Sequence, residues 1–274
     1  MTRPEIGKSI KTGDYNTNYH DIGEGFPVIL AHGSGRGVTA WANWRLIIPI
    51  LSKNRRVIAP DFVGFGYTDR PEGMEYNMKN WVKQMIDFLD ALGLDQVDMI
   101  GNSFGGALSL AMAVEYPERI RKVVLMGSAG TSFPITKGLE EVWGYTPSAE
   151  NMKNIISTMV YDGSIATDDL AQMRYEATIM PGFQEAFSSM FPAPRQRWLD
   201  SMARTDEELM GIDKPVLIVH GREDRVVPLE SSYKIFSLIK NARLHVFGQC
   251  GHWTQIEHTD EFASLVDDFL TLSK

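Results

Sequence analysis

The chain has 274 residues, enough for one large hydrophobic core that carries an insertion. Its 43% of hydrophobic and 23% of charged residues are typical of a globular protein. The net charge of -8 disfavours nucleic acid or an anionic membrane surface as the main partner, and no stretch approaches the roughly 20 apolar residues of a membrane-spanning helix.

Strands are expected first as a hairpin and then as six short apolar runs. Residues 6–22 alternate loosely around the turn signal Gly13-Asp14, which predicts an antiparallel hairpin. The later runs are rich in β-branched residues, as in strands buried on both faces of a parallel sheet. They are residues 28–31, 57–59, 97–100, 123–126, 216–219 and 244–247.

Helices are expected between most of these strands. Five segments place apolar residues three and four positions apart, the spacing of an amphipathic helix. They are residues 41–51, 81–92, 108–116, 231–239 and 262–272. Strands that alternate with helices predict an α/β fold, with a mostly parallel sheet flanked by helices and joined by right-handed crossovers.

One stretch interrupts this alternation. Residues 135–210 contain helical patches, turn signals such as Pro181-Gly182, and many Met and aromatic residues, but no convincing buried strand. We interpret them as a helical cap over the sheet, which divides the core domain into residues 1–134 and 211–274. The alternative is a set of ordinary crossover helices.

The densest motif lies at residues 101–107, which read G-N-S-F-G-G-A. It contains G-x-S-x-G between a predicted strand and a predicted helix, the context of the nucleophile elbow of α/β-hydrolases. Small neighbours let the strand and helix approach closely, and the start of the helix favours negative charge. The motif predicts Ser103 as a nucleophile. The alternative is a glycine-rich turn with no catalytic role.

A serine nucleophile needs a base and a group that orients the base, and α/β-hydrolases supply them in the order Ser, Asp or Glu, His. Asp224 follows the predicted strand 216–219, and His252 follows 244–247. Loops beyond the carboxyl ends of parallel strands are where open α/β sheets place their sites. The order predicts the triad Ser103, Asp224 and His252. Glu223 is the competitor of Asp224.

A second glycine-rich loop, His32-Gly33-Ser34-Gly35, follows the predicted strand 28–31. It resembles the H-G-x-G loop of α/β-hydrolases, which supplies one N–H of the oxyanion hole, while the residue after the nucleophile, Phe104, supplies the other. The rival is a dinucleotide phosphate loop, whose third glycine would fall on Val38.

No metal or cofactor site is expected from the sequence. None of the six histidines forms H-E-x-x-H, and the chain has a single cysteine, Cys250, which we interpret as a packing residue. Met1 leads into no apolar run of signal-peptide length, and one cysteine excludes an internal disulfide. These features predict a cytoplasmic protein.

Together the motifs resemble the meta-cleavage product hydrolases, and most closely the 2-hydroxymuconic semialdehyde hydrolases and their alkyl-substrate relatives. The resemblance extends over nearly the whole chain, including the cap. Its segments are residues 32–35, 40–44, 101–107, 133–136, 143–147, 191–198 and 251–253. The chain departs from the pattern at Arg36, where many members have proline, so the oxyanion loop is expected to differ in shape there.

The resemblance implies hydrolysis of a carbon–carbon bond in the breakdown of aromatic compounds. The substrate would be a 2-hydroxy-6-oxo-hexa-2,4-dienoate formed by ring opening, and the products 2-hydroxypenta-2,4-dienoate and a carboxylic acid. Hydrogen or a small alkyl group is favoured over phenyl as the C6 substituent. Partners would be this small dienoate and further copies of the chain, in a homodimer or a larger assembly.

The resemblance also implies roles for individual residues. Arg174, in the cap, would hold the substrate carboxylate, a task that suits a guanidinium. Without the resemblance, Arg174 is a surface helix residue and Trp253 a core aromatic. Asn43 and Asn102 would hydrogen-bond the carboxylate or the C2 oxygen, and Trp253 would lie along the dienoate. Gly33, Ser34 and Phe104 would form the pocket that holds the C6 oxygen, with Ser34 and Phe104 as the oxyanion hole.

Two other functions stay open at this point. A carboxylesterase or lactonase would use the same triad but would not require Arg174. A ligand receptor that retains a hydrolase fold would keep the triad but turn over far more slowly than about 1 per second.

Overall fold

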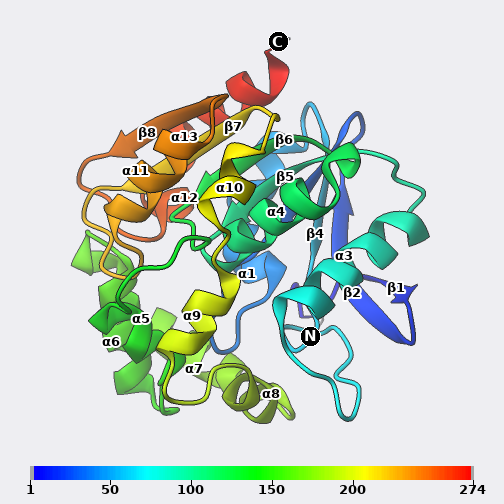
Figure 1. Cartoon of the computed structure of the whole chain (residues 1–274). Helices are drawn as coiled ribbons and strands as arrows, with labels where there is room; N and C mark the ends of the chain where they lie inside the picture. The colour runs from blue at the N-terminus through cyan, green and yellow to red at the C-terminus, as the bar shows by residue number, and fades with distance from the viewer. Residues whose placement is uncertain (1–2, 273–274) are drawn as a thin grey trace.

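The computed structural model describes residues 3–272, and its centre is an eight-stranded sheet. The strands lie side by side in the order β1-β2-β4-β3-β5-β6-β7-β8 (Figure 1). β1 and β2 form the predicted hairpin, β2 is antiparallel to β4, and all other neighbours are parallel. The hairpin, the six predicted strands and the mostly parallel α/β sheet are therefore confirmed. The strands are β1 (Lys8–Thr12), β2 (Tyr15–Ile22), β3 (Pro27–Ala31), β4 (Arg56–Pro60), β5 (Val97–Asn102), β6 (Ile120–Met126), β7 (Val216–Gly221) and β8 (Ala242–Phe247).

Helices flank the sheet, and four of the five predicted ones are confirmed. They are α3 (Met78–Ala91), α4 (Phe104–Glu115), α11 (Leu229–Leu238) and α13 (Thr259–Thr271), beside the short α12 (Thr254–Glu257) and the 3₁₀ turn η1 (Pro117–Arg119). Among the helices of residues 3–272, none combines the length and hydrophobicity needed to cross a bilayer.

The prediction of a single helix over residues 41–51 is wrong. The segment contains two short helices, α1 (Ala40–Trp44) and α2 (Ile48–Leu51). Pro49 has no N–H to bond to the carbonyl of Arg45, and its ring would clash with that carbonyl inside a continuous helix. The chain therefore ends α1 and begins α2 with Pro49 in the first turn.

The two faces of the sheet are both buried. In β3, Ile29 and Ala31 join the core that contains the inner sides of α3 and α4, whereas Val28 and Leu30 join the core formed with α1, α2 and α13. Successive side chains of a strand point to opposite faces, so a strand covered on both sides must be apolar at every position. This explains why the centre of β3 is an unbroken apolar run.

All chain between β6 and β7 that the structure describes is helix or loop. The segment holds α5 (Lys137–Trp143), α6 (Ala149–Met159), η2 (Gly163–Ile165), α7 (Asp168–Thr178), α8 (Phe183–Met190), α9 (Gln196–Met202) and α10 (Asp206–Met210). Helices α5 to α9 gather at one end of the sheet (Figure 1), and α6 and α7 enclose a small apolar cluster of their own around Ile156. The last helix, α10, packs instead against α4 and α11.

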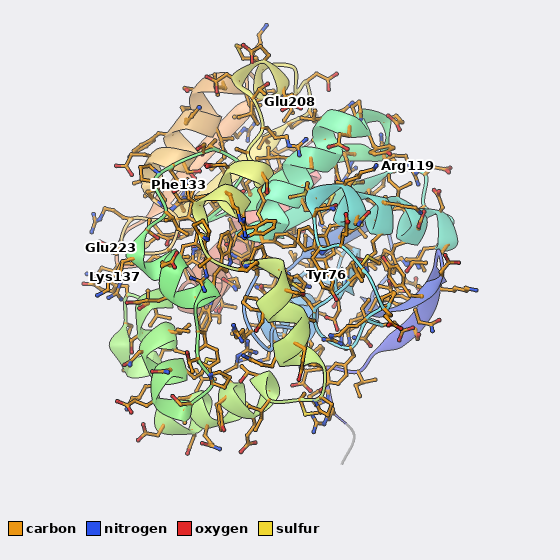
Figure 2. All side chains as sticks on the ribbon, turned by 60° about the horizontal axis from the view of Figure 1, so that its bottom comes forward. Tyr76, Arg119, Phe133, Lys137, Glu208 and Glu223 are labelled. Atoms are coloured by element: carbon orange, nitrogen blue, oxygen red, sulfur yellow. The ribbon has the colours of Figure 1, made fainter. Side chains whose placement is uncertain are left out.

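The helical segment is anchored to the loop that follows β7. A Cβ on Gly138 of α5 would lie 2.3 Å from the carbonyl oxygen of Arg225, and the Thr136 hydroxyl donates to the carbonyl of Val226 at 2.7 Å. Lys137 and Glu223 accordingly lie at the same edge of the molecule (Figure 2). The helices are thus held over the carboxyl end of the sheet, where the predicted catalytic loops emerge.

Candidate active site

Ser103 occupies the turn between β5 and α4 with φ 53° and ψ -113°, a strained conformation for a residue with a side chain. The three glycines around it are required by space. A Cβ would lie 2.3 Å from the Gly105 carbonyl at Gly101, 2.2 Å from the Ala31 carbonyl at Gly105, and 2.1 Å from the Ser128 hydroxyl at Gly106. The turn therefore has the build of a nucleophile elbow.

Ser103 borders a mainly apolar cavity, which His252 also lines. Within residues 3–272 this hydroxyl has no hydrogen-bond partner, and the residue is 7% exposed. A hydroxyl without a partner at the start of a helix is free to turn toward the base. Hydrogen bonds of this kind are often long before substrate binds.

The imidazole of His252 pairs with the carboxylate of Asp224. Nδ1 lies 2.7 Å from Oδ2, and both side chains are almost completely buried. The pair packs on Gly127, which follows β6 with φ 49°; a Cβ there would lie 3.0 Å from His252 Nδ1 and 3.2 Å from Asp224 Oδ2. The N–H of Ser103 donates to the neighbouring carbonyl of Met126 at 2.9 Å. Loops after β5, β6, β7 and β8 thus converge on one point.

Asp224 has further partners that hold it as a carboxylate. Its Oδ1 accepts the N–H groups of Val226 at 2.7 Å and Val227 at 2.9 Å. Burial opposes a charge there, but the rings of His252 and His220 outweigh burial and hold the pKa of Asp224 well below its usual range. Glu223, the competing carboxylate, pairs instead with Arg222 and accepts the N–H of Cys250.

His220 is a neighbour of the site that the sequence did not single out. Its Nε2 lies 3.3 Å from Asp224 Oδ2 and 3.0 Å from the carbonyl oxygen of Val227, and its Nδ1 lies 2.6 Å from the Ser232 hydroxyl. A carbonyl only accepts, so Nε2 carries the proton and Nδ1 accepts from Ser232. The signal that could have found it is its position at the end of β7, four residues before Asp224.

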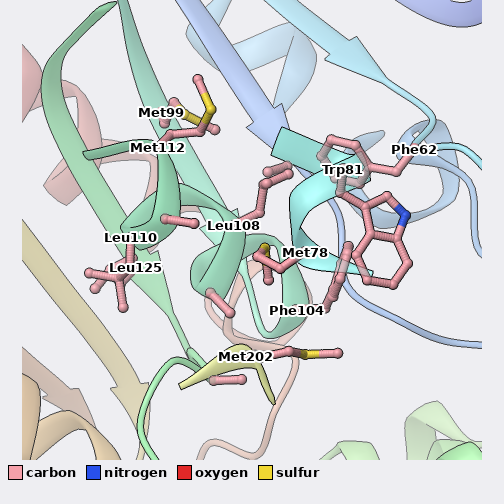
Figure 3. Packing of buried hydrophobic residues seen from close by; sticks show 14 of the residues in the cluster. Phe62, Met78, Trp81, Met99, Phe104, Leu108, Leu110, Met112, Leu125 and Met202 are labelled. Atoms are coloured by element: carbon pink, nitrogen blue, oxygen red, sulfur yellow. The ribbon is translucent and has the colours of Figure 1, made fainter. Parts of the chain in front are cut away.

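The backbone N–H groups of Ser34 and Phe104 have no acceptor among residues 3–272, which leaves them free for a developing negative charge. Ser34 lines the cavity, and Phe104 follows Ser103 at the start of α4. The Phe104 ring itself lies in the core, 4.6 Å from the Trp81 ring and 5.9 Å from the Phe62 ring (Figure 3). Trp143 of α5 donates to the Ser34 hydroxyl at 3.0 Å and so fixes the loop.

The cavity brings together most of the residues expected to touch substrate, although Phe104 is not among those that line it. Gly33 donates its N–H to Asn43 at 2.8 Å, and a Cβ on Gly33 would lie 2.9 Å from the side-chain oxygen of Asn102. The Asn43 amide nitrogen is buried without a partner. In the described residues 3–272, no cluster of His, Cys, Asp and Glu is arranged as a metal site. The lining includes Gly33, Ser34, Asn43, Asn102, Ser103, Leu139, Val142, Arg174, Val226, His252 and Trp253.

Arg174 reaches this cavity from α7. Burial and, to a smaller extent, the positive charge of Arg45 lower the pKa of its guanidinium to about 10. Among residues 3–272 no carboxylate forms an ion pair with it. A half-buried cation without a counterion is arranged to receive an anionic ligand.

Cys250 lies two residues before His252 but takes no part in the site. It is fully buried, and burial raises the pKa of its thiol to about 12. Thiolate is the reactive form, so iodoacetamide at pH 8 should leave the activity of the folded enzyme unchanged. Mass spectrometry of the treated enzyme beside an activity assay checks this, and rapid labelling with loss of activity would contradict it.

Comparison with known proteins places the chain in a family. The model of the α/β-hydrolase fold matches residues 27–259. A 2-hydroxy-6-oxo-2,4-heptadienoate hydrolase of Pseudomonas putida is 56% identical over 97% of this chain and 96% of its own length. A 2-hydroxymuconate semialdehyde hydrolase of a Pseudomonas species is 54% identical over 97% and 94%.

Solved structures of similar proteins indicate the same family. The S103A mutant of a meta-cleavage product hydrolase from Pseudomonas fluorescens IP01, complexed with acetates, matches with a TM-score of 0.97 and 58% identity over 98% of both chains. The fold, the elbow with its cavity and these relatives lead to one conclusion: this chain belongs to the α/β-hydrolases, and among them to the serine-type hydrolases of meta-cleavage products.

Proposed function

We propose that the enzyme cleaves the C5–C6 bond of a 2-hydroxy-6-oxo-hexa-2,4-dienoate, with hydrogen or a small alkyl group on C6. The observation that carries the proposal is an unpaired guanidinium, Arg174, in the same cavity as Ser103 and His252. Relatives at 56% and 54% identity, named for a heptadienoate and a semialdehyde, support the small substituent.

Arg174 would hold the carboxylate at C1. The amide nitrogen of Asn43, buried without a partner, and the amide of Asn102 would donate to the carboxylate or the C2 oxygen. Trp253, in the same wall, would lie along the flat dienoate. This arrangement stabilises negative charge at the C2 end while the dienol becomes a ketone and C5 gains a proton.

The second half of the reaction takes place at Ser103. His252 removes the hydroxyl proton, and the oxygen attacks the C6 carbonyl while Asp224 stabilises the charged imidazole. The N–H groups of Ser34 and Phe104 receive the oxyanion. Collapse breaks the C5–C6 bond, and the electron pair leaves as a dienolate that takes up a proton. Water then releases the carboxylic acid.

Arg174→Met separates this reaction from ester or lactone hydrolysis. Loss of a charged hydrogen bond to the carboxylate should lower kcat/KM for the dienoate about 10- to 100-fold. p-Nitrophenyl acetate has no carboxylate, so its kcat/KM should fall at least about tenfold less. The assay follows bleaching of the yellow dienoate and release of p-nitrophenol. Equal losses with both substrates would contradict the assignment of Arg174 and favour the esterase.

We further propose that residues 135–210 act as a cap, with α5 to α9 over the cavity. Met152, Met159 and Tyr145 from this segment line the cavity, which supports a role in closing it. Limited proteolysis within the segment should be slowed by bound substrate analogue; equal rates would contradict the role.

We also propose that the enzyme works in the cytoplasm as an assembly of identical chains. A single buried cysteine suits a reducing compartment. Tyr233 and Phe236, one turn apart on α11, are 51% and 44% exposed and offer apolar surface for a partner chain. Cell fractionation and sedimentation velocity test the two statements.

A further inference from the structure

The loop that carries His252 lies directly against the helical segment between β6 and β7. The carbonyl of Met159, the last residue of α6, accepts the N–H groups of His252 at 2.6 Å and Trp253 at 3.2 Å. Gly251 has no room for a side chain, because a Cβ would lie 2.6 Å from this carbonyl oxygen and 2.9 Å from the nitrogen of Tyr161. The backbone beside the predicted catalytic histidine is therefore bonded to the proposed cap.

One carboxylate, that of Glu257 at the end of α12, joins the two sides of this contact. Its Oε2 accepts the N–H of Gly251 at 2.6 Å, in the loop of the histidine. Its Oε1 accepts the N–H groups of Tyr161 at 2.6 Å and Asp162 at 3.0 Å, in the chain that follows α6. Hydrogen bonds from N–H groups to an ionised carboxylate are short and roughly twice as strong as those between neutral groups.

The charge of Glu257 is compensated by these N–H groups. The residue is half-buried, and within residues 3–272 it forms no ion pair with a lysine, arginine or histidine. If the two segments moved apart, one carboxylate oxygen would lose its partners, which is costly for a charge that is partly removed from water. The carboxylate therefore opposes separation of the histidine loop from the end of α6.

The loop of Asp224 contacts the same segment. Arg225, the next residue, donates from Nη2 to the carbonyl oxygens of Ser157 and Val160, both at 2.6 Å. Residues 157–162 thus bond to the loop of the acid and to the loop of the base. The hydrogen bond between the triad's carboxylate and imidazole, 2.7 Å long, joins two loops that share this support.

We propose that Glu257 is a positioning residue for His252: it fixes the loop of the base to the end of α6, so that the cap helps to set where the imidazole lies. This rests on the proposed function, in which His252 takes the proton of Ser103. The transfer requires the imidazole within hydrogen-bond reach of the hydroxyl, and a misplacement of about 1 Å can cost about 100-fold in rate. Arg174, on α7, is not held by these bonds.

Glu257→Gln tests the proposal with a side chain of the same size. An amide has one accepting oxygen and one donating NH₂ group. If the oxygen keeps the N–H groups of Tyr161 and Asp162, the NH₂ group meets the N–H of Gly251, and two donors oppose each other. The reverse orientation sets the NH₂ group against the two N–H groups after α6. In either orientation, the histidine loop is no longer tied to the cap.

The expected result is a loss in kcat without a matching loss in binding. kcat should fall about 10- to 100-fold, for the dienoate and for p-nitrophenyl acetate alike, because both reactions use His252. Affinity for the dienoate, measured in the Ser103→Ala background, should fall less than about threefold. The far-downfield proton NMR signal of the hydrogen bond between His252 and Asp224 should shift or broaden.

Two further variants complete the test. Glu230→Gln, which changes an exposed carboxylate on α11, is the matched control and should leave kcat, affinity and the NMR signal unchanged. Glu257→Asp keeps the charge on a side chain too short to reach both segments. It should lower kcat at least about threefold with affinity retained, which tests the proposal even if Glu257→Gln does not fold.

The outcomes separate this proposal from the proposed function. A lower Tm with normal kcat and an unchanged NMR signal would mean that Glu257 only stabilises the fold, and the proposal would be wrong. Equal losses in kcat and affinity would also overturn it, because the effect would then lie in the shape of the cavity. If the unmodified enzyme does not bleach the dienoate, the proposed function has failed, whereas ester hydrolysis and the NMR signal still decide whether Glu257 positions His252.

Discussion

Ser103→Ala is expected to lower kcat for the dienoate by at least about 10³-fold, because it removes the hydroxyl that attacks C6 and leaves His252 and Asp224 without a nucleophile to activate. Binding should survive, since the Ser103 hydroxyl has no partner in the structure and the residues at the carboxylate end are unchanged. Tm should also change little, since no hydrogen bond of the folded state is lost.

Stopped-flow bleaching of the dienoate measures the loss, and the spectrum of the bound substrate measures binding. Ser237→Ala, an exposed serine on α11, is the control and should behave as the unmodified enzyme. Turnover within tenfold of normal by Ser103→Ala would refute the nucleophile and with it the mechanism proposed above.

Asp224→Asn is expected to lower kcat about 10⁴-fold, although it changes one atom. The asparagine oxygen would keep the N–H groups of Val226 and Val227, at 2.7 and 2.9 Å, which turns its NH₂ group toward His252 Nδ1. An amide NH₂ only donates, so Nδ1 must accept and the proton of the neutral ring moves to Nε2. His252 then has no lone pair for the proton of Ser103.

His220 strengthens this expectation. Its Nε2–H is directed at Val227 and lies 3.3 Å from the oxygen that would become NH₂, so the variant also sets two donors against each other. Glu223→Gln is the matched control, an amide in place of the adjacent carboxylate, which pairs with Arg222 outside the triad. A kcat of Asp224→Asn within tenfold of normal, or an equal loss in Glu223→Gln, would contradict the assignment.

The fold predictions that the structure confirmed depend on the residue types within each short segment. Short apolar runs such as residues 28–31 are typical of strands covered on both faces, and the structure buries both faces of β3. The error over residues 41–51 came from following the apolar spacing and ignoring Pro49, whose missing N–H is a local signal that overrides spacing.

For the active site too, some features could be predicted from the sequence and others only from the tertiary structure. By itself the sequence determined that a serine lies in an elbow, with an aspartate and a histidine after later strands, because the glycine spacing and the ends of apolar strands can be recognised in the sequence. Only the tertiary structure decided that His252 pairs with Asp224 and not Glu223, that His220 lies against the same carboxylate, and that Arg174 has no ion-pair partner among residues 3–272. Pairing depends on which loops meet in space. The residues that share one cavity come from α7 and from the loops after β3, β5, β7 and β8, and no sequence spacing predicts their contact.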